Sequence, residues 1–311
     1  MKKVDIIIPA YQSHATIDKT LASIACQIIK DFEINVSIVN DAGDGYIEQL
    51  IEWRKYFNIR QINRVTNGGG GLARQTGIDN TNGDYIVFID SDDVFFSPLA
   101  ISHLVKGIEG HDMCMGNFIE ETDDGTYTRH DFNTTWFHGK IISRQAIERM
   151  NLRFNDTRIN EDVGWNLVFR GLSDDVVYID KDVYLWLNNE NSTVRKNRMD
   201  SHFGSGWRGL IDNWMWAYHE LKKRESDKAY ELSLNILCNS YFRFVEAVRA
   251  NRQEIESNRN KLHEMFEKIE GNQLKLDDVA HEFIRVQKSF ELEVIPQITF
   301  AEYLKMLGYT G

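Results

Sequence analysis

Two hydrophobic periodicities alternate along the first hundred residues, and this alternation restricts the possible folds more than any other feature of the chain. Short runs rich in β-branched residues lie at 4–8, 34–39, 59–62 and 85–89. Between the first two runs, Leu21, Ile24 and Ile28 recur at the spacing of a helix, and Ile47 and Ile51 mark another helix after the second run. Later helices are expected from Ser97-Pro98, with Ser at the cap and Pro in the first turn, and from Ser143. Strands and helices in turn predict right-handed βαβ units around a mostly parallel sheet, which is an α/β fold. Ligands of such sheets bind beyond the carboxyl ends of the strands.

The chain beyond residue 205 has a different pattern. Trp207, Trp214 and Tyr218 lie on one face of an expected helix, whereas Trp216 lies off that face. Further helices are expected at 262–269, 279–290 and 300–307. We therefore expect an α/β domain at 1–204 and an α-helical region of about 100 residues at 205–311.

The composition disfavours several classes of protein. With 36 Lys and Arg against 47 Asp and Glu, the chain has a net charge of −11, which disfavours nucleic acid and anionic membranes as main partners. The three cysteines show no Cys-x-x-Cys spacing, which argues against a zinc finger and fits reduced thiols. Asp5 and Pro9 interrupt the N-terminal apolar stretch, and no segment approaches the roughly 18 apolar residues of a membrane span. We therefore expect a cytoplasmic protein.

Three carboxylates follow the run at 85–89, in the sequence Asp90-Ser91-Asp92-Asp93. Carboxylates this close together repel one another unless a cation or hydrogen-bond donors compensate. Oxygen ligands of this kind suit Mg²⁺ or Mn²⁺, which often bridge a protein carboxylate to substrate phosphates. An alternative stays open, in which the segment is an acidic turn and Asp93 or Ser91 caps the next helix.

A run of four glycines, Gly68–Gly71, precedes Ala73 and Arg74. Its spacing meets the loose form of the dinucleotide fingerprint, but in that fold the glycines follow the first strand, whereas here Pro9-Ala10-Tyr11 follow it. Two other interpretations stay open: a backbone that passes close to a diphosphate, with Arg74 supplying positive charge, or a surface turn.

Two further groups are ambiguous by themselves. Glu161 and Asp162 lie in the first turn of a helix expected to begin at Asn160, where the helix dipole stabilises carboxylates whether or not they act in catalysis. His138, in the segment 136–140, fits a metal ligand, an acceptor contact or a half-buried structural histidine, and by itself it favours the structural interpretation.

In combination, these segments resemble the family 2 glycosyltransferases of the GT-A fold. The blocks that carry the resemblance are Val4 to Tyr11, Val39 to Gly43, Asn67 to Gly77, Gly83 to Asp93, His138 to Lys140, and Asn160 to Asp162. Their common order over the first 190 residues or so is far more specific than any one block, and the resemblance does not extend to the helical C-terminus. It implies a Rossmann-like, mostly parallel sheet that binds a nucleotide-diphospho-sugar.

The resemblance also implies roles for individual residues. The residues that match the nucleotide-sugar site are Pro9, Tyr11, Asp41, Arg74, Asp90 and Ser91. Asp90 and Asp92 match the Asp-x-Asp pair that holds a divalent cation, Mn²⁺ or Mg²⁺, beneath the diphosphate. Asp162 matches the general base that deprotonates the acceptor hydroxyl, and Glu161 stands beside it as a second catalytic-site residue. The residues that match the acceptor side are Trp136, His138, Gly139 and Lys140.

The implied reaction is the metal-dependent transfer of a hexose or pentose from a nucleotide-diphosphate-sugar, expected to be UDP-linked, to an acceptor hydroxyl with inversion. Asn40-Asp41-Ala42-Gly43 replaces the more usual Asp-Asp-Gly-Ser. The Gln-x-x-Arg-Trp motif of processive synthases is missing, so we expect single or limited transfer to a glycan, polymer or protein. The acidic charge disfavours a modified nucleic-acid base as acceptor, and a homo-oligomer is compatible with the chain.

Two other functional classes stay open. A sugar-1-phosphate nucleotidyltransferase has a related architecture, but it usually carries its Gly-rich loop directly after the first strand. A non-catalytic carbohydrate-binding protein on the same fold is disfavoured by the intact Asp90, Asp92 and Asp162.

Overall fold

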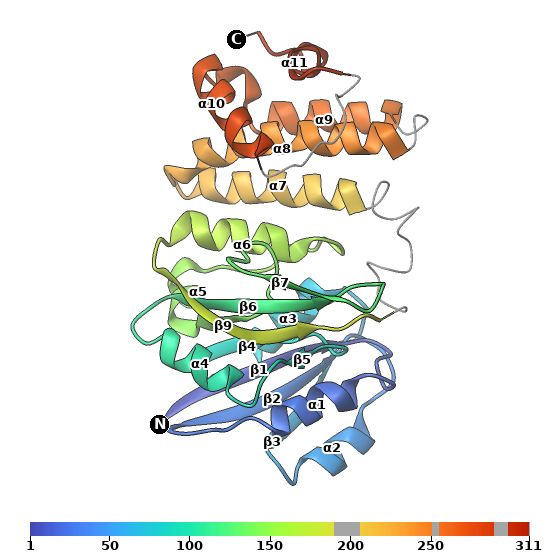
Figure 1. Ribbon diagram of the computed structural model, residues 1–311, viewed down its shortest axis with the longest axis vertical. Helices are drawn as coiled ribbons and strands as arrows, with labels where there is room; N and C mark the ends of the chain where they lie inside the picture. Colours follow the sequence, from blue (N-terminus) through green and yellow to red (C-terminus); the bar gives the residue numbers. More distant parts are fainter. Residues whose placement is uncertain (190–205, 251–254, 289–297, 311) are drawn as a thin grey trace. The chain divides into compact units, whose positions relative to one another are not determined.

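The computed structural model in Figure 1 describes residues 1–189, 206–250, 255–288 and 298–310. The chain divides into two compact units, Met1–Ser192 and Thr193–Gly311. The boundary expected between residues 204 and 205 lies outside the described residues.

The first unit is built on a nine-stranded sheet. Its strands are β1 (Lys2–Ala10), β2 (Phe32–Asn40), β3 (Asn58–Asn63), β4 (Tyr85–Phe88), β5 (Val94–Phe95), β6 (Met113–Glu121), β7 (Tyr127–His130), β8 (Lys140–Ser143) and β9 (Val176–Trp186). Their order is β3-β2-β1-β4-β8-β6-β9-β5, and β7 pairs with β6. β1 runs parallel to β2 and β4, and β2 runs parallel to β3, which confirms the predicted α/β fold. The other half of the sheet is mixed, because β8 runs antiparallel to both β4 and β6.

Helices pack on both faces of this sheet. They are α1 (Ile17–Ala25), α2 (Ile47–Trp53), α3 (Gly70–Asp79), α4 (Ala100–Gly107), α5 (Arg144–Met150) and α6 (Glu161–Leu172). Successive side chains of a strand point to opposite faces, so Ile6 of β1 packs in one core with Leu21 of α1 and Leu104 of α4. Ile7 faces α3, where a Cβ on Gly77 would lie 2.4 Å from Ile7 Cγ2. Alternate side chains of β1 therefore pack into hydrophobic cores on opposite faces of the sheet.

Some predicted element boundaries are wrong for identifiable reasons. The first helix ends at Ala25, and Ile28 lies beyond it with its backbone N–H donating to the Pro98 carbonyl oxygen. The helix expected from Ser97-Pro98 begins at Ala100, with Leu99 at its N-cap. By contrast, the helix predicted from Ser143 is capped as expected, because the Ser143 side chain accepts a hydrogen bond from the Ala146 N–H.

In the described part of the second unit, all the regular secondary structure is helical. Its α-helices are α7 (Gly206–Lys223), α8 (Lys228–Ala250), α9 (Ile255–Lys268), α10 (Leu276–Gln287) and α11 (Phe300–Leu307). Phe283 and Phe300 stack with ring centroids 4.2 Å apart. Trp214 is buried and Trp216 is half-buried, while the side chain of Trp207 lies outside the described part. Within the described residues, no helix combines the length and the apolar character needed to cross a membrane.

Candidate active site

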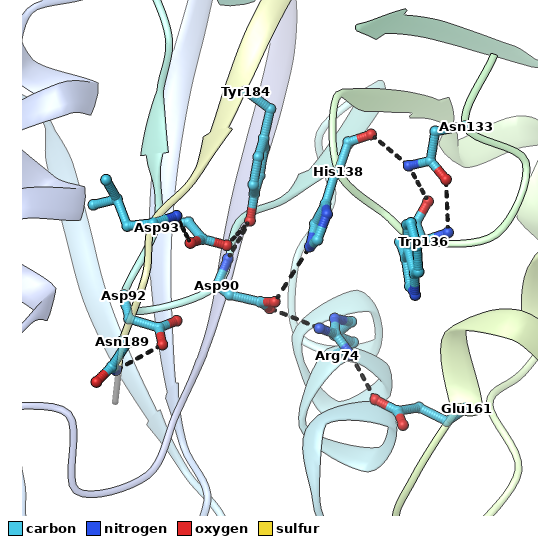
Figure 2. Close-up of polar contacts among 11 residues, drawn as sticks. Arg74, Asp90, Asp92, Asp93, Asn133, Trp136, His138, Glu161, Tyr184 and Asn189 are labelled. Carbon is cyan, nitrogen blue, oxygen red and sulfur yellow. Dashed lines mark hydrogen bonds and ion pairs between the residues drawn. The ribbon is translucent and has the colours of Figure 1, made fainter. Parts of the chain in front are cut away.

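An acidic turn at the carboxyl end of β4 forms the centre of the site. The Asp93 N–H donates to the Asp90 carbonyl oxygen at 3.1 Å, which closes the turn Asp90–Asp93. Side chains from α3, α6, β9 and the segment before β8 converge on this turn (Figure 2). The structure therefore brings together residues that are far apart in the sequence, at the sheet edge where α/β folds bind ligands.

Arg74 of α3 bridges the carboxylate of Asp90, in the acidic turn, and the carboxylate of Glu161, in α6. Its Nη2 lies 2.7 Å from Asp90 Oδ1, and its Nη1 lies 2.7 Å from Glu161 Oε1. Burial raises the pKa of Asp90, but the charges and hydrogen bonds of Arg74 and His138 together outweigh burial and hold that pKa below its ordinary value. Both terminal nitrogens of Arg74 are thus engaged within the protein, where they bridge the acidic turn and α6, and its contact with the nucleotide stays a prediction.

The glycine run allows α6 to approach α3 closely. A Cβ on Gly71 would lie 2.6 Å from Glu161 Cγ, and a Cβ on Gly70 would lie 2.9 Å from Glu161 Oε1. These distances are shorter than real Cβ contacts. The glycines therefore allow α3 and α6 to pack closely, which neither the diphosphate nor the surface-turn interpretation anticipated.

Asp41, at the end of β2, is engaged by the start of the same run. Its carboxylate accepts hydrogen bonds from the N–H groups of Gly68 and Gly69, and its Oδ1 lies 2.7 Å from Arg64 Nε. The Asp41 side chain is buried, whereas Tyr11 is half exposed at 50%. Of these two predicted nucleobase contacts, only Tyr11 presents its side chain to solvent, because the carboxylate of Asp41 orders the glycine loop.

Asp162 lies in the first turn of α6, next to Glu161. Its Oδ1 accepts a hydrogen bond from the Val163 N–H at 2.8 Å. Burial, followed by the charge of Glu161, raises the pKa of Asp162 to about 7. A carboxylate with this pKa can accept a proton near neutral pH, which is the property of a general base.

His138 faces the acidic turn. Its Nε2 lies 3.9 Å from Asp90 Oδ2, the oxygen that Arg74 leaves open, and its buried Nδ1 has no hydrogen-bond partner among the described residues. Ligand atoms of Asp90, Asp93 and His138 lie within 4.8 Å of one another. Carboxylate oxygens are preferred by Mg²⁺ and Mn²⁺, so the donor set fits a divalent cation at this turn.

The other two carboxylates of the turn have different partners. Asp92, predicted as a metal residue, accepts a hydrogen bond from Asn189 Nδ2 at 2.9 Å, and burial followed by the charge of Asp90 raises its pKa. Asp93 is buried and accepts hydrogen bonds from the Tyr184 hydroxyl and the Leu187 N–H. Asp93 therefore ties β9 to the acidic turn, a function different from the helix cap considered above. Ser91, half-buried, lies between Asp90 and Asp92.

The predicted acceptor residues separate into two groups. Trp136 is 37% exposed, and its ring centroid lies 6.0 Å from that of His138. Lys140 is 1% exposed, and its Nζ donates to Asn166 Oδ1. A Cβ on Gly139 would lie 3.1 Å from the Gly116 carbonyl oxygen. Lys140 and Gly139 are therefore packed inside the unit, whereas Trp136 is open to solvent, and contact of these residues with the acceptor stays a prediction.

Sequence reasoning missed two residues that organise the site. Tyr184, near the end of β9, stacks on His138 with a centroid distance of 4.7 Å. Asn166 is buried, and its amide donates to the carbonyl oxygens of Thr135 and Asp162. Asn166 could have been found as a polar residue on the apolar face of the expected helix. Tyr184 had no such signal, because aromatic residues are common in strands.

Comparison with known proteins identifies the family. The profile of glycosyl transferase family 2 matches residues 5–167. The uncharacterized glycosyltransferase EpsJ of Bacillus subtilis is 27% identical over 239 residues, which cover 67% of this chain and 68% of EpsJ. The GalNAc(5)-diNAcBac-PP-undecaprenol beta-1,3-glucosyltransferase of Campylobacter jejuni is 26% identical over 178 residues, which cover 50% of this chain and 56% of that enzyme.

A solved structure has the same fold. The crystal structure of residues 1–349 of Staphylococcus aureus TarS in complex with UDP-GlcNAc superposes with a TM-score of 0.70 at 17% identity, covering 99% of this chain and 92% of that chain. The fold and the family profile agree, and the profile spans the acidic turn, Arg74 and Asp162. The chain belongs to glycosyl transferase family 2 and is a glycosyltransferase.

Proposed function

We propose that the chain transfers a sugar from a UDP-sugar to an acceptor hydroxyl with inversion at the anomeric carbon, that the reaction depends on Mn²⁺ or Mg²⁺, and that Asp162 is the general base. The observation that carries this proposal is the chain of contacts Asp90–Arg74–Glu161, which ends beside Asp162. It connects the candidate cation turn and the candidate base through ion pairs of the buried Arg74. A transfer by direct displacement needs these two groups on opposite sides of the sugar.

Each group of this network has a separate role in the proposed reaction. A divalent cation at the acidic turn would be held by Asp90, Asp93 and His138, whose ligand atoms lie close together, with Asp92 as a further proposed ligand. Such a cation would stabilise the negative charge that develops on the leaving diphosphate. Asp162 removes the proton of the acceptor hydroxyl as that oxygen attacks the anomeric carbon, because its pKa of about 7 leaves a basic carboxylate at neutral pH. Arg74 and Glu161 hold the two groups apart and keep their carboxylates oriented. No covalent intermediate on the protein is required.

The acceptor side is supported by two aromatic rings, the exposed Trp136 and the half-buried Trp186. Trp136 lies beside His138, and the Trp136 and Trp186 centroids are 6.1 Å apart. Aromatic faces of this kind pack against sugar rings and other apolar surfaces. TarS is named a poly(ribitol-phosphate) β-N-acetylglucosaminyltransferase, and the Campylobacter relative is named for a polyprenol-linked glycan. We propose a glycan or a polyol-phosphate polymer as acceptor, and a role for the helical unit in binding the acceptor or a second copy of the chain.

A donor screen tests the function. Thermal unfolding is measured with a panel of UDP-, GDP- and dTDP-sugars, each with Mn²⁺ and with excess chelator, because a ligand that binds the native state raises its stability. We expect a UDP-sugar to give the largest shift, and sugar release or transfer from that donor to follow in a turnover assay. A protein that no nucleotide-sugar stabilises, with or without Mn²⁺, would contradict the proposal.

A further inference from the structure

We propose that Tyr184 is a positioning residue of the cation site, whose hydroxyl fixes the turn Asp90–Asp93 and whose ring fixes the His138 imidazole. The inference rests on the cation dependence proposed above. It concerns a residue from β9, which lies outside the acidic turn and outside the segment that carries His138.

The hydroxyl of Tyr184 joins the two ends of the acidic turn. It accepts a hydrogen bond from the Asp90 N–H at 3.3 Å and donates one to Asp93 Oδ2 at 2.6 Å. The remaining oxygen of Asp93 accepts the Leu187 N–H at 2.9 Å. One phenol thus holds both the first and the last residue of the turn, and a phenylalanine ring would hold neither.

The ring of Tyr184 supports the imidazole. The two rings stack with centroids 4.7 Å apart and planes 19° apart, and Tyr184 is 1% exposed. Phe118 contacts the imidazole edge to face at 5.1 Å. Packed in this way, His138 is restricted in rotation while its Nε2 points at Asp90 Oδ2 (Figure 2).

These contacts explain why a carboxylate and an imidazole from separate segments face one another. Residues that orient metal ligands are worth about 10- to 100-fold in metal affinity. A ring that only filled space would be replaced by phenylalanine without such a loss. The hydroxyl and the ring of Tyr184 therefore make separable contributions, and each can be removed alone or together with the other.

The same strand supplies a matched control. Tyr178 also lies on β9, donates its hydroxyl to a buried amide, Asn117 Oδ1, and stacks on a neighbouring ring, Phe132, at a centroid distance of 4.1 Å. Tyr178→Phe removes a hydroxyl that also forms a hydrogen bond on a stacked ring, from a half-buried position on the same strand. Neither Tyr178 nor its partners belong to the group that could hold a cation.

The test is a titration with Mn²⁺ alone, in which electron paramagnetic resonance measures the free ion for the wild type, Tyr184→Phe and Tyr178→Phe. We expect Tyr184→Phe to weaken Mn²⁺ binding about tenfold and Tyr178→Phe to change it less than about twofold. Tyr184→Leu, which also removes the stacked ring, should approach about 100-fold. The decision rests on Tyr184→Phe, which removes one oxygen atom and is checked for folding by circular dichroism.

Three results would overturn the inference: wild-type Mn²⁺ affinity in Tyr184→Phe, an equal loss in Tyr178→Phe, or no Mn²⁺ binding by the wild type. The last result leaves the donor screen unaffected, because that screen contains a chelator arm. A protein that is stabilised by a UDP-sugar in chelator but binds no Mn²⁺ keeps its proposed donor and loses its proposed cation site.

Discussion

The two units bury different kinds of polar side chain. In the described part of the α/β unit, the buried residues that form ion pairs include Asp5, Asp41, Arg74 and Glu161. In the described part of the helical unit, the buried polar residues are Asn213, Ser233 and Ser240, which are all neutral. Burying an ionised group costs far more free energy than burying a neutral one. The α/β unit therefore gives up stability to hold charges in place, as active sites do, whereas the helical unit is arranged for packing.

The largest expected effect tests whether these buried charges serve catalysis. Asp162→Asn preserves size and removes the basic carboxylate, so turnover should fall by about 10²- to 10⁴-fold. Affinity for the donor should change less than about twofold, because the donor lies on the side of the acidic turn. Single-turnover transfer and donor titration measure the two quantities. Near-normal turnover, or a joint loss of donor binding and chemistry, would remove Asp162 from the role of base.

The acidic turn is tested by Asp92→Asn. Loss of one carboxylate should weaken Mn²⁺-dependent nucleotide binding by at least about tenfold, and excess chelator should have the same effect on the wild type. The thermal unfolding midpoint without ligand should stay close to that of the wild type, because Asp92 accepts only the Asn189 hydrogen bond from another described side chain. Full transfer activity in chelator would contradict this prediction.

The pH dependence of transfer should reflect the burial of Asp162. Its pKa is raised to about 7, so the basic form is lost as the pH falls through 7. The turnover rate at saturating substrate should decline about tenfold for each pH unit below that value. A rate profile measured between pH 5 and 9 checks this, and a flat profile through pH 7 would show that no group with such a pKa acts as the base.

Two adjacent acids should change stability in opposite directions. The pKa of Asp162 in the folded state lies above its ordinary value, so ionising this carboxyl group destabilises the folded state. The free energy of unfolding therefore decreases as the pH rises from about 4, the ordinary pKa, to about 7. Asp162→Asn should therefore raise the unfolding midpoint more at pH 8 than at pH 5. Glu161→Gln should lower stability by about 1 to 3 kcal/mol, because Arg74 loses a charged partner inside the protein.

Thermal melts of both variants at the two pH values provide the measurement. If both variants were destabilised equally at pH 8, the burial of charge at Asp162 would not cost the α/β unit any stability, and the contrast between the two units would weaken.

The smallest expected effect concerns the helical unit. Trp216 is half-buried and lies off the face that Trp214 buries, so Trp216→Ala should change stability by less than about 1 kcal/mol. If the helical unit binds the acceptor, the same variant should raise the KM for the acceptor a few fold and leave the KM for the donor unchanged. Trp214→Ala is the packing control, with an expected loss of about 3 to 5 kcal/mol. Unchanged acceptor kinetics in Trp216→Ala would contradict a role of Trp216 in acceptor binding.

The strands and most helices could be predicted because their signals are local. The runs at 4–8 and 34–39 became parallel neighbours, and the helix from Ser143 carries the cap that its sequence predicts. Ile47 and Ile51 show where local reasoning fails. They mark the helix α2 correctly, yet they are 66% and 63% exposed, because the helix does not pack through the side that bears them. Periodicity locates a helix but does not say which neighbour it meets.

The sequence by itself determined the α/β alternation, the acidic turn after β4 and the pair Glu161-Asp162, because each depends on residues close together in the chain. Only the tertiary structure decided how they are used. Arg74 and Glu161 are 87 positions apart, and Asp93 and Tyr184 are 91 positions apart, so no local pattern predicts either contact. Glu161 leaves no room for a side chain at Gly71, and the buried Lys140 donates from its Nζ to Asn166, 26 positions along the chain. Charge in a protein interior is tolerated only where partners meet it, and the fold alone chooses the partners.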